Sequence, residues 1–351
     1  MNAMPGQPVV RVLGNEQDGE RVWERVANGL PHSTLAHAAE WRTVIRQAYG
    51  HEPLYLIAED GDGRAGLLPS FLVRRPMVGS VAASMPFLDA GGPCAASEAL
   101  AQALVQRLLA EASRVNAAVV DIRCTERLSL ESVPLAHKVN MSLALPADPD
   151  RLWKQFDGSV RNQVRKAQRS GLSIEFGGAE KLEDFHAIFA TRMHDLGSPV
   201  HSKRFFDAVF NGFGSRARVA LVRKGATPVG GLIALARNDV MTVPWASCLP
   251  EYFSLCSNML LYWETIRAAC LDGYGRFDFG RSTRDSGTYR FKRQWGALES
   301  PLYWYSISAA PRNDRPAGKS AAAACLVGLW KRLPLAVTRR LGPHVRRYLI
   351  Q

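Results

Sequence analysis

Residues 277–297, FDFGRSTRDSGTYRFKRQWGA, concentrate side chains that could bind and convert an anionic substrate. Phe277 and Phe279 alternate with Asp278, which predicts a strand with both rings on one face and the carboxylate on the other. Gly280 then lets the backbone turn or approach a ligand closely. Arginine binds phosphate and carboxylate in a bidentate manner. The residues expected to hold an anionic acceptor are Arg281, Ser282, Arg290 and Lys292.

A simpler interpretation of this loop is a solvated turn with paired charges such as Arg284–Asp285. The chemical interpretation is acyl transfer, which needs a proton acceptor, a donor to the oxyanion and alignment of two substrates. No G-x-S-x-G nucleophile motif is present, and Cys248 in WASCLP has no histidine nearby, so we expect it to be a core cysteine. Direct attack by the acceptor is therefore favoured. The candidate catalytic residues are Asp278, His194 and Tyr289.

A second basic element precedes this loop. Residues 159–170 have a helical pattern, and Gly171 is the expected C-terminal cap. Arg161 and Arg165 are four residues apart and so share a helix face. This face is expected either to form a basic wall for the anionic substrate or to be the solvated side of a linker helix.

Two halves of the chain repeat the same order of elements. Residues 40–73 and 204–236 each read as a helix with aromatic anchors, a Gly stop and two strands joined by a turn. At an offset of 164, the following pairs fall together: Trp41 and Phe205, Tyr49 and Phe213, Gly50 and Gly214, Gly66 and Gly230.

Each half continues in the same way. A helix and a strand follow at 99–117 and 118–124, and again at 258–274 and 276–280. Asp121 then falls on Asp278 at an offset of 157. This order predicts a duplicated α/β (α+β) unit around a mixed sheet.

Length and composition agree with two globular domains. The 351 residues are 47% hydrophobic and 22% charged, which excludes a disordered chain. No apolar run is long enough for a transmembrane helix. The six scattered cysteines form no CxxC pair, and no H-x-x-x-H pattern or carboxylate cluster suggests a metal. We therefore expect a cytoplasmic protein without a metal.

The charge is concentrated at one end. The net charge is +12, and residues 312–351 hold nine Lys or Arg and one acid, which is +8. We expect domains at 1–150 and 151–310, followed by a basic amphipathic tail at 311–351. Its part at 319–351 could lie on an anionic membrane surface, peripherally on the inner membrane, or pack as a helix pair on the second domain.

Two stretches of the sequence resemble a known protein family. RNQVRKAQRSGLSIE resembles a helix of the FemAB-type peptidyltransferases, and the string from SNMLLYWETIRAACLDGY to FKRQWGA resembles the C-terminal signature of FemAB-like acetyltransferases. The chain is most similar to the branch associated with exosortase and PEP-CTERM exopolysaccharide systems. The resemblance implies two tandem GNAT-like domains. It also implies acyl transfer to an anionic sugar or lipid-linked acceptor of the cell envelope.

The resemblance also implies a place for the donor. In a GNAT fold, Trp245, Ser247 and Tyr252 would lie beside splayed strands that admit acyl-CoA (acetyl-CoA). Asn258, or its neighbour Ser257, would cap the next helix. The preceding segment PEYFSLCSN lacks the glycines of the usual pyrophosphate turn. Aminoacyl-tRNA, the donor of the peptidoglycan-bridge relatives, is therefore the alternative. A non-catalytic scaffold at the membrane surface is a third hypothesis.

Overall fold

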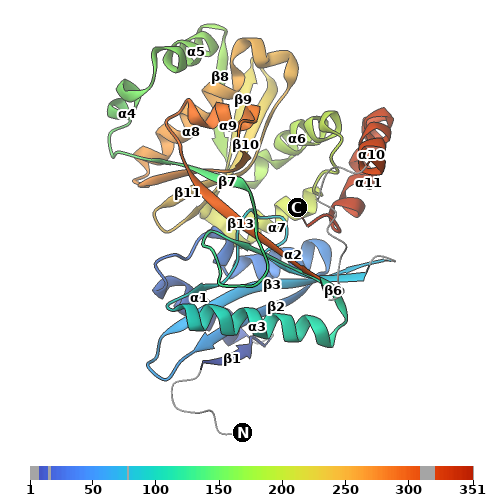
Figure 1. Cartoon of the computed structure of the whole chain (residues 1–351). Helices are drawn as coiled ribbons and strands as arrows, with labels where there is room; N and C mark the ends of the chain where they lie inside the picture. The colour runs from blue at the N-terminus through green and yellow to red at the C-terminus, as the bar shows by residue number, and fades with distance from the viewer. Residues whose placement is uncertain (1–7, 15–16, 77–78, 309–320, 351) are drawn as a thin grey trace. The chain divides into compact units, whose positions relative to one another are not determined.

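The computed structural model describes residues 8–14, 17–76, 79–308 and 321–350 (Figure 1). Contacts divide the chain into two compact units. The first unit holds residues 1–139, 300–315 and 348–351, and the second holds 140–299 and 316–347. The domain boundaries predicted at 150 and 310 treat each domain as one continuous stretch. The last strand of the first unit instead comes from beyond residue 300.

The first unit is a mixed sheet with helices on both faces. Its strand order is β1-β2-β3-β4-β6-β13, in which β4 and β6 are parallel and the other neighbours are antiparallel. Its elements are β1 (Val9–Val12), α1 (Gln17–Gly29), α2 (Glu40–Tyr49), β2 (Glu52–Glu59), β3 (Ala65–Arg75), β4 (Gly79–Ser84), β5 (Cys94–Ala95), α3 (Glu98–Arg114), β6 (Ala117–Cys124) and β13 (Leu298–Ser308), with a 3-10 turn at Leu35–His37.

Side chains alternate between the two faces of this sheet, and each face packs against different helices. Leu56 and Leu68 face the buried leucines of α3, whereas Tyr55 points to the opposite face and its ring lies 4.4 Å from that of Trp23 in α1. Successive strand residues point to opposite faces, so one sheet buries two layers. The helix α3 also makes the crossover that the parallel pair β4 and β6 requires.

The second unit repeats this plan. Its elements are β8 (Leu172–Gly177), α6 (Leu182–Leu196), α7 (Lys203–Phe213), β9 (Ala217–Lys224), β10 (Thr227–Arg237), β11 (Val240–Cys248), α8 (Ser257–Leu271), β12 (Arg276–Thr283) and α9 (Gly287–Arg293), with 3-10 turns at Ala179–Lys181, Gly214–Arg216 and Pro250–Leu255. Its strand order is β8-β9-β10-β11-β12, and only β11 and β12 are parallel. Two further helices, α4 (Pro149–Gln155) and α5 (Gly158–Arg169), precede β8.

The predicted repeat is confirmed in topology and in register. Ala58 pairs with Gly66 in the first hairpin, and Val222 pairs with Gly230 in the second, again 164 residues apart. Both glycines allow a close approach. A Cβ on Gly66 would lie 2.7 Å from that of Ala95, and one on Gly230 would lie 2.3 Å from the sulfur of Cys248. The sequence analysis missed β4, because this short strand of Gly, Ser and Ala has only Val81 as a β-branched residue and no aromatic one to identify it.

The strand β7 (Leu135–Ala144) crosses the division between the units, and its residues from Asn140 on belong to the second unit, where β7 neighbours β12. The tail forms two helices, α10 (Ala321–Arg332) and α11 (Leu335–Arg346), which pack on α6 in the second unit (Figure 1). The predicted start of the tail at 311 lies outside the described residues. Within the part of the chain that the structure describes, no helix is both long and apolar enough to cross a membrane.

Candidate functional site

The strands β11 and β12 part from each other halfway along their lengths. They pair only from Val240 with Arg276 to Thr242 with Asp278, although β11 continues to Cys248 and β12 to Thr283. Beyond this last pair, no backbone ladder joins β11 to β12 among the described residues. Asp278, predicted as a catalytic residue, stands at the last paired position.

The sequence of β11 explains why the strands part there. Two residues, Val243 and Pro244, lie opposite Ala234 alone on β10, so β11 carries a bulge at this point. Proline has no backbone N–H and occurs within sheets at edges and bulges. The bulge and Pro244 together end the ladder just after Thr242.

The strand β12 bends at the same level. Gly280 has φ +71°, and its N–H donates to Asp278 Oδ1 over 2.8 Å. A left-handed conformation favours glycine, which agrees with the turn expected at this position. The predicted alternation is also confirmed, since the rings of Phe277 and Phe279 both contact Tyr262 of α8, with ring centroids 6.4 and 5.6 Å apart.

Lys292 does not have the solvated position expected of a residue that holds an acceptor. Its side chain is only 7% exposed, and Nζ donates to the carbonyl oxygens of Gly280 over 2.9 Å and Arg281 over 2.7 Å. A buried ammonium must find such partners, because desolvation of an unpaired charge is costly. Lys292 therefore holds the bend of β12 in place, and Arg281, half-buried, emerges directly from that bend.

Two predicted serines are buried without a hydrogen bond. The hydroxyls of Ser247 on β11 and Ser282 on β12 have no partner among the described residues, and both side chains lie beyond the last β11–β12 pair. Buried hydroxyls are normally satisfied, so an orphaned one needs an explanation. Each of the two parted strands thus presents a polar group that a bound molecule could satisfy.

The helix α8 begins beside the end of β11 and has no side-chain cap. Its N-cap residue is Cys256, at φ +60°, which corrects the prediction that Ser257 or Asn258 caps the helix. Asn258 is half-buried in the first turn. An uncapped first turn leaves backbone N–H groups and the positive end of the helix dipole free to bind an anion. The left-handed Cys256 also provides a tight turn where a glycine would be usual.

Cys248 is not a nucleophile in this structure. Its thiol is buried next to the Ser257 hydroxyl, and burial raises its pKa to about 12. A thiol with such a pKa stays protonated at neutral pH, and the thiolate is the reactive form. The sequence-based expectation of a core cysteine is thereby confirmed.

Two other predicted residues are engaged in contacts of their own. Trp245 is buried among Phe205, Phe206 and His201, with ring centroids 5.4, 5.2 and 6.2 Å away, so it is a core residue. His194 was expected in a loop, but it belongs to the last turn of α6, and its Nδ1 lies 3.1 Å from Thr338 Oγ1 of α11. We therefore withdraw His194 as a general base, because it fastens the tail.

Tyr289 and Arg290 lie on the short helix α9. Ser286 caps this helix by accepting from Tyr289 N over 3.2 Å, and Arg290 is exposed. Tyr289 shares a hydrogen bond with the Glu299 carboxylate, which raises the pKa of Tyr289. Arg284 also pairs with Glu299, over 3.1 Å, where the sequence suggested Asp285. Tyr289 is thus engaged locally, and it is a weaker catalytic candidate than Asp278.

The predicted basic helix is confirmed as α5, and Gly171 follows its C-cap at φ +70°. Arg165 lies over the ring of Trp153 at 5.6 Å, and the ring of Trp153 in turn lies 4.7 Å from that of Trp263 in α8. Arg161 is half-buried. Tyr252 is half-buried in the 3-10 turn before α8. Arg161, Arg165 and Tyr252 lie on or beside helices of the second unit. No contact that the structure describes brings them together with Asp278.

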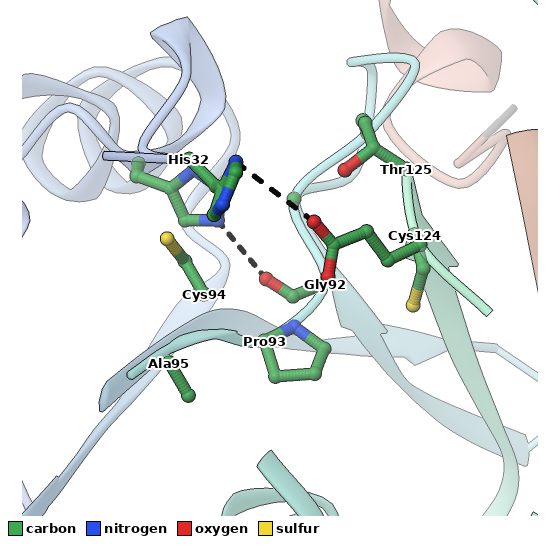
Figure 2. Close-up of a pocket in the computed structure, with 11 residues that line it drawn as sticks. His32, Gly92, Pro93, Cys94, Ala95, Cys124 and Thr125 are labelled. Atoms are coloured by element: carbon green, nitrogen blue, oxygen red, sulfur yellow. Dashed lines mark hydrogen bonds and ion pairs between the residues drawn. The ribbon is translucent and has the colours of Figure 1, made fainter. Parts of the chain in front are cut away.

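The first unit contains a separate hollow of about 430 Å³. Its inner part, shown in Figure 2, has Cys94 and Cys124 on different strands and His32 on the loop after α1. His32 faces Glu126 at 3.9 Å, and His37 Nε2 lies 3.0 Å from Gly92 O. The lining of the hollow carries both signs of charge, with Glu98, Glu126 and Arg127.

Residues 154–293 match the family described as Acetyltransferase (GNAT) domain. This stretch runs from α4 to α9 and includes both parted strands and the open start of α8. The matched stretch lies within the second unit. No curated protein was found to match the chain.

Solved structures share the fold of nearly the whole chain. FemX has a TM-score of 0.63 at 12% identity, covering 82% of this chain and 96% of FemX. L-PGS from Bacillus licheniformis has a TM-score of 0.54 at 12% identity, covering 94% and 97%. A tandem GNAT protein from the clavulanic acid biosynthesis pathway has 0.53 at 13% identity, covering 88% and 100%. The mixed α/β fold of two GNAT-like domains, expected from the sequence, is therefore confirmed.

Sequence reasoning missed two residues that shape this region. Pro244 ends the β11–β12 ladder, and Cys256 makes the left-handed turn before α8. A proline inside an otherwise apolar strand is a readable signal of a bulge. A left-handed cysteine gives no such signal, because glycine or asparagine is the usual residue there.

Proposed function

We propose that the chain is an acyltransferase that moves an acyl group from a donor at the start of α8 to an anionic sugar or lipid-linked acceptor. The observation that carries this proposal is the parting of β11 and β12, with the orphaned hydroxyls of Ser247 and Ser282 on the parted ends. The match of residues 154–293 to the GNAT acetyltransferase domain supports the same reaction class.

Acyl-CoA is the proposed donor. Its pyrophosphate would take the uncapped N–H groups of α8, where the left-handed Cys256 makes the turn that the missing glycines would provide. Its acyl arm would extend along the part of β11 that no longer pairs with β12. A backbone N–H at that place would stabilise the oxyanion of the tetrahedral intermediate.

The acceptor would attack the thioester directly in a ternary complex. The acceptor's nitrogen or oxygen forms the new bond to the acyl carbon, the carbon–sulfur bond breaks, and the CoA thiolate takes up a proton. Asp278 is the proposed acceptor of the proton that the nucleophile loses, because it stands where the strands part. Arg281 is the proposed contact to the acceptor's phosphate or carboxylate.

The resemblance of residues 258–297 to FemAB-like enzymes of exopolysaccharide systems supports an acceptor from cell-envelope or exopolysaccharide synthesis. The fold likeness to FemX favours a second candidate function, in which aminoacyl-tRNA is the donor. Both candidates use the same parted strands, and they differ only in the leaving group.

The test is a turnover assay with two donors. Purified full-length chain is mixed with a nucleotide-sugar acceptor and either acetyl-CoA or charged tRNA, and acceptor modification is followed by mass spectrometry. Transfer from acetyl-CoA that Asp278→Asn abolishes supports the proposal. Transfer from charged tRNA alone supports the second candidate. Modification that is equal for Asp278→Asn and for the unchanged chain contradicts both.

A further inference from the structure

The tail helices have one face fixed against the second unit. Thr338 Oγ1 lies 3.1 Å from His194 Nδ1, and Arg346 Nε donates to His201 Nε2 over 3.1 Å. Burial lowers the pKa of His201 well below its ordinary value, so its ring is neutral and Nε2 can accept. Close packing at Gly342, where an added Cβ would lie 3.0 Å from Val200, further sets the rotation of α11.

An exposed apolar stripe runs along α11 beside this fixed face. Val337, Leu341 and Val345 are spaced by four residues, so they lie on one side of the helix, and all three are exposed. The helix α10 adds Leu326, 66% exposed, and Leu329, 58% exposed. Large aliphatic side chains gathered in this way mark an interaction surface rather than ordinary scattered exposure.

The two helices also carry positive charge and no negative charge. Residues 321–350 contain no Asp or Glu, and their Lys and Arg residues are Lys331, Arg332, Arg339, Arg340, Arg346 and Arg347, of which Arg346 is turned to His201. Arg340 and His344 lie one turn apart next to the stripe of Val337 and Leu341. An apolar stripe bordered by cations is the pattern of a helix that lies in the plane of a bilayer interface.

We propose that the outer face of α10 and α11 docks on an anionic lipid bilayer. The aliphatic side chains would enter the boundary between headgroups and acyl chains, and the arginines would meet the lipid phosphates. A nucleic acid would use the cations but not the aliphatic stripe, since its affinity comes mainly from phosphate contacts. The combination of both features on one face therefore favours lipid.

The experiment is cosedimentation of the full-length chain with vesicles. At low salt, the chain is expected to bind vesicles containing phosphatidylglycerol at least tenfold more tightly than vesicles of phosphatidylcholine alone. Leu341→Glu should weaken this binding on the order of tenfold, because it removes an inserted side chain and adds a repelled charge. The paired change of Arg339→Gln and Arg340→Gln, which leaves the apolar stripe intact, should weaken it by a similar factor.

Two matched controls guard against general effects. Leu271→Glu alters an equally exposed leucine at the end of α8, and Arg204→Gln removes an exposed arginine of α7, so both should leave vesicle binding unchanged. Equal binding to neutral and anionic vesicles would overturn the proposal, as would tail variants that bind like the controls. Tighter binding to unacylated tRNA than to anionic vesicles at the same salt would overturn it in favour of a nucleic acid.

Discussion

The parallel strand pairs of the two units end at the same position of the repeat, but the residues that follow this position differ. In the first unit the parallel pair β4 and β6 ends at Ala83 and Asp121, and in the second the pair β11 and β12 ends at Thr242 and Asp278. Asp121 and Asp278 are the two residues that fell together at the sequence offset of 157. The last position of the parallel ladder is therefore an aspartate in both units.

Two residues farther along, the units diverge. The first unit has Arg123, only 2% exposed, whose guanidinium donates to Leu88 O over 2.7 Å and to Ile350 O, and lies 4.9 Å from the Trp304 ring. The second unit has Gly280, which has no side chain. The chain fills the end of the first strand pair with its own groups and leaves the end of the second pair open.

The helix that connects the two strands of each parallel pair shows a further contrast. Ser97 caps α3 by accepting from Leu100 N, whereas no side chain caps α8. Polar groups that have hydrogen-bond partners within the protein stabilise the fold, whereas groups without such partners can bind a ligand. The comparison shows that the same scaffold occurs in both units and that they differ in the residues at the end of the parallel pair and in the capping of the crossover helix.

The largest difference between the units is expected when the two corresponding aspartates, Asp278 and Asp121, are each replaced in separate variants. Asp278→Asn should lower acyl transfer by about 10²- to 10⁴-fold, because an amide cannot accept the proton. Asp121→Asn should leave the rate unchanged. The measurement is the initial rate of CoA thiol release at saturating donor. Equal losses in both variants would mean that neither unit is specialised.

The next test gives the second unit the side chain of the first. Gly280→Arg should lower the rate about 100-fold, since the side chain would fill the open end and also strain a residue at φ +71°. Gly280→Ala imposes the same strain, about 1–2 kcal/mol, without the volume. The rates of both variants are compared with their thermal melts. If alanine is as harmful as arginine, strain rather than a filled site explains the loss.

A third test separates stability from activity. Arg123→Ala should lower the free energy of unfolding by about 3 kcal/mol, because it leaves buried carbonyls unsatisfied, while the rate per folded molecule stays the same. Lys292→Ala should cost about 2 kcal/mol and also lower the rate, because Lys292 holds the bend that presents Arg281. Urea unfolding and turnover of both variants give the two quantities. A rate unaffected by Lys292→Ala would make that lysine purely structural.

The smallest effect is expected at the orphaned hydroxyls. Ser282→Ala and Ser247→Ala should weaken donor binding about five-fold, the value of one hydrogen bond, without loss of stability. Ser97→Ala, which removes the cap of α3, should instead cost about 1 kcal/mol of stability and leave donor binding unchanged. Calorimetric titration with acetyl-CoA checks the first, and thermal melts check the second. Stability lost with the orphaned serines would show that they already have partners.

Local pattern alone was enough for much of the fold. Helical spacing and a glycine stop predicted α2 and α7 with their caps, because both signals depend on neighbours a few residues away. Alternation placed Phe277 and Phe279 on one face of β12 for the same reason. The matched spacing of Gly66 and Gly230 gave the duplication, since equal spacing in the chain produces equal register in the hairpins.

Only the tertiary structure decided which partners each polar side chain has. Residue types alone do not distinguish Lys292 from Arg281, yet folding brings Lys292 back to the carbonyls of Gly280 and Arg281, twelve and eleven residues away. His194 was equally ambiguous until Thr338, 144 residues later, bonded to it. The supply of partners for a charged or polar side chain depends on contacts between distant segments, and those contacts exist only after the chain has folded.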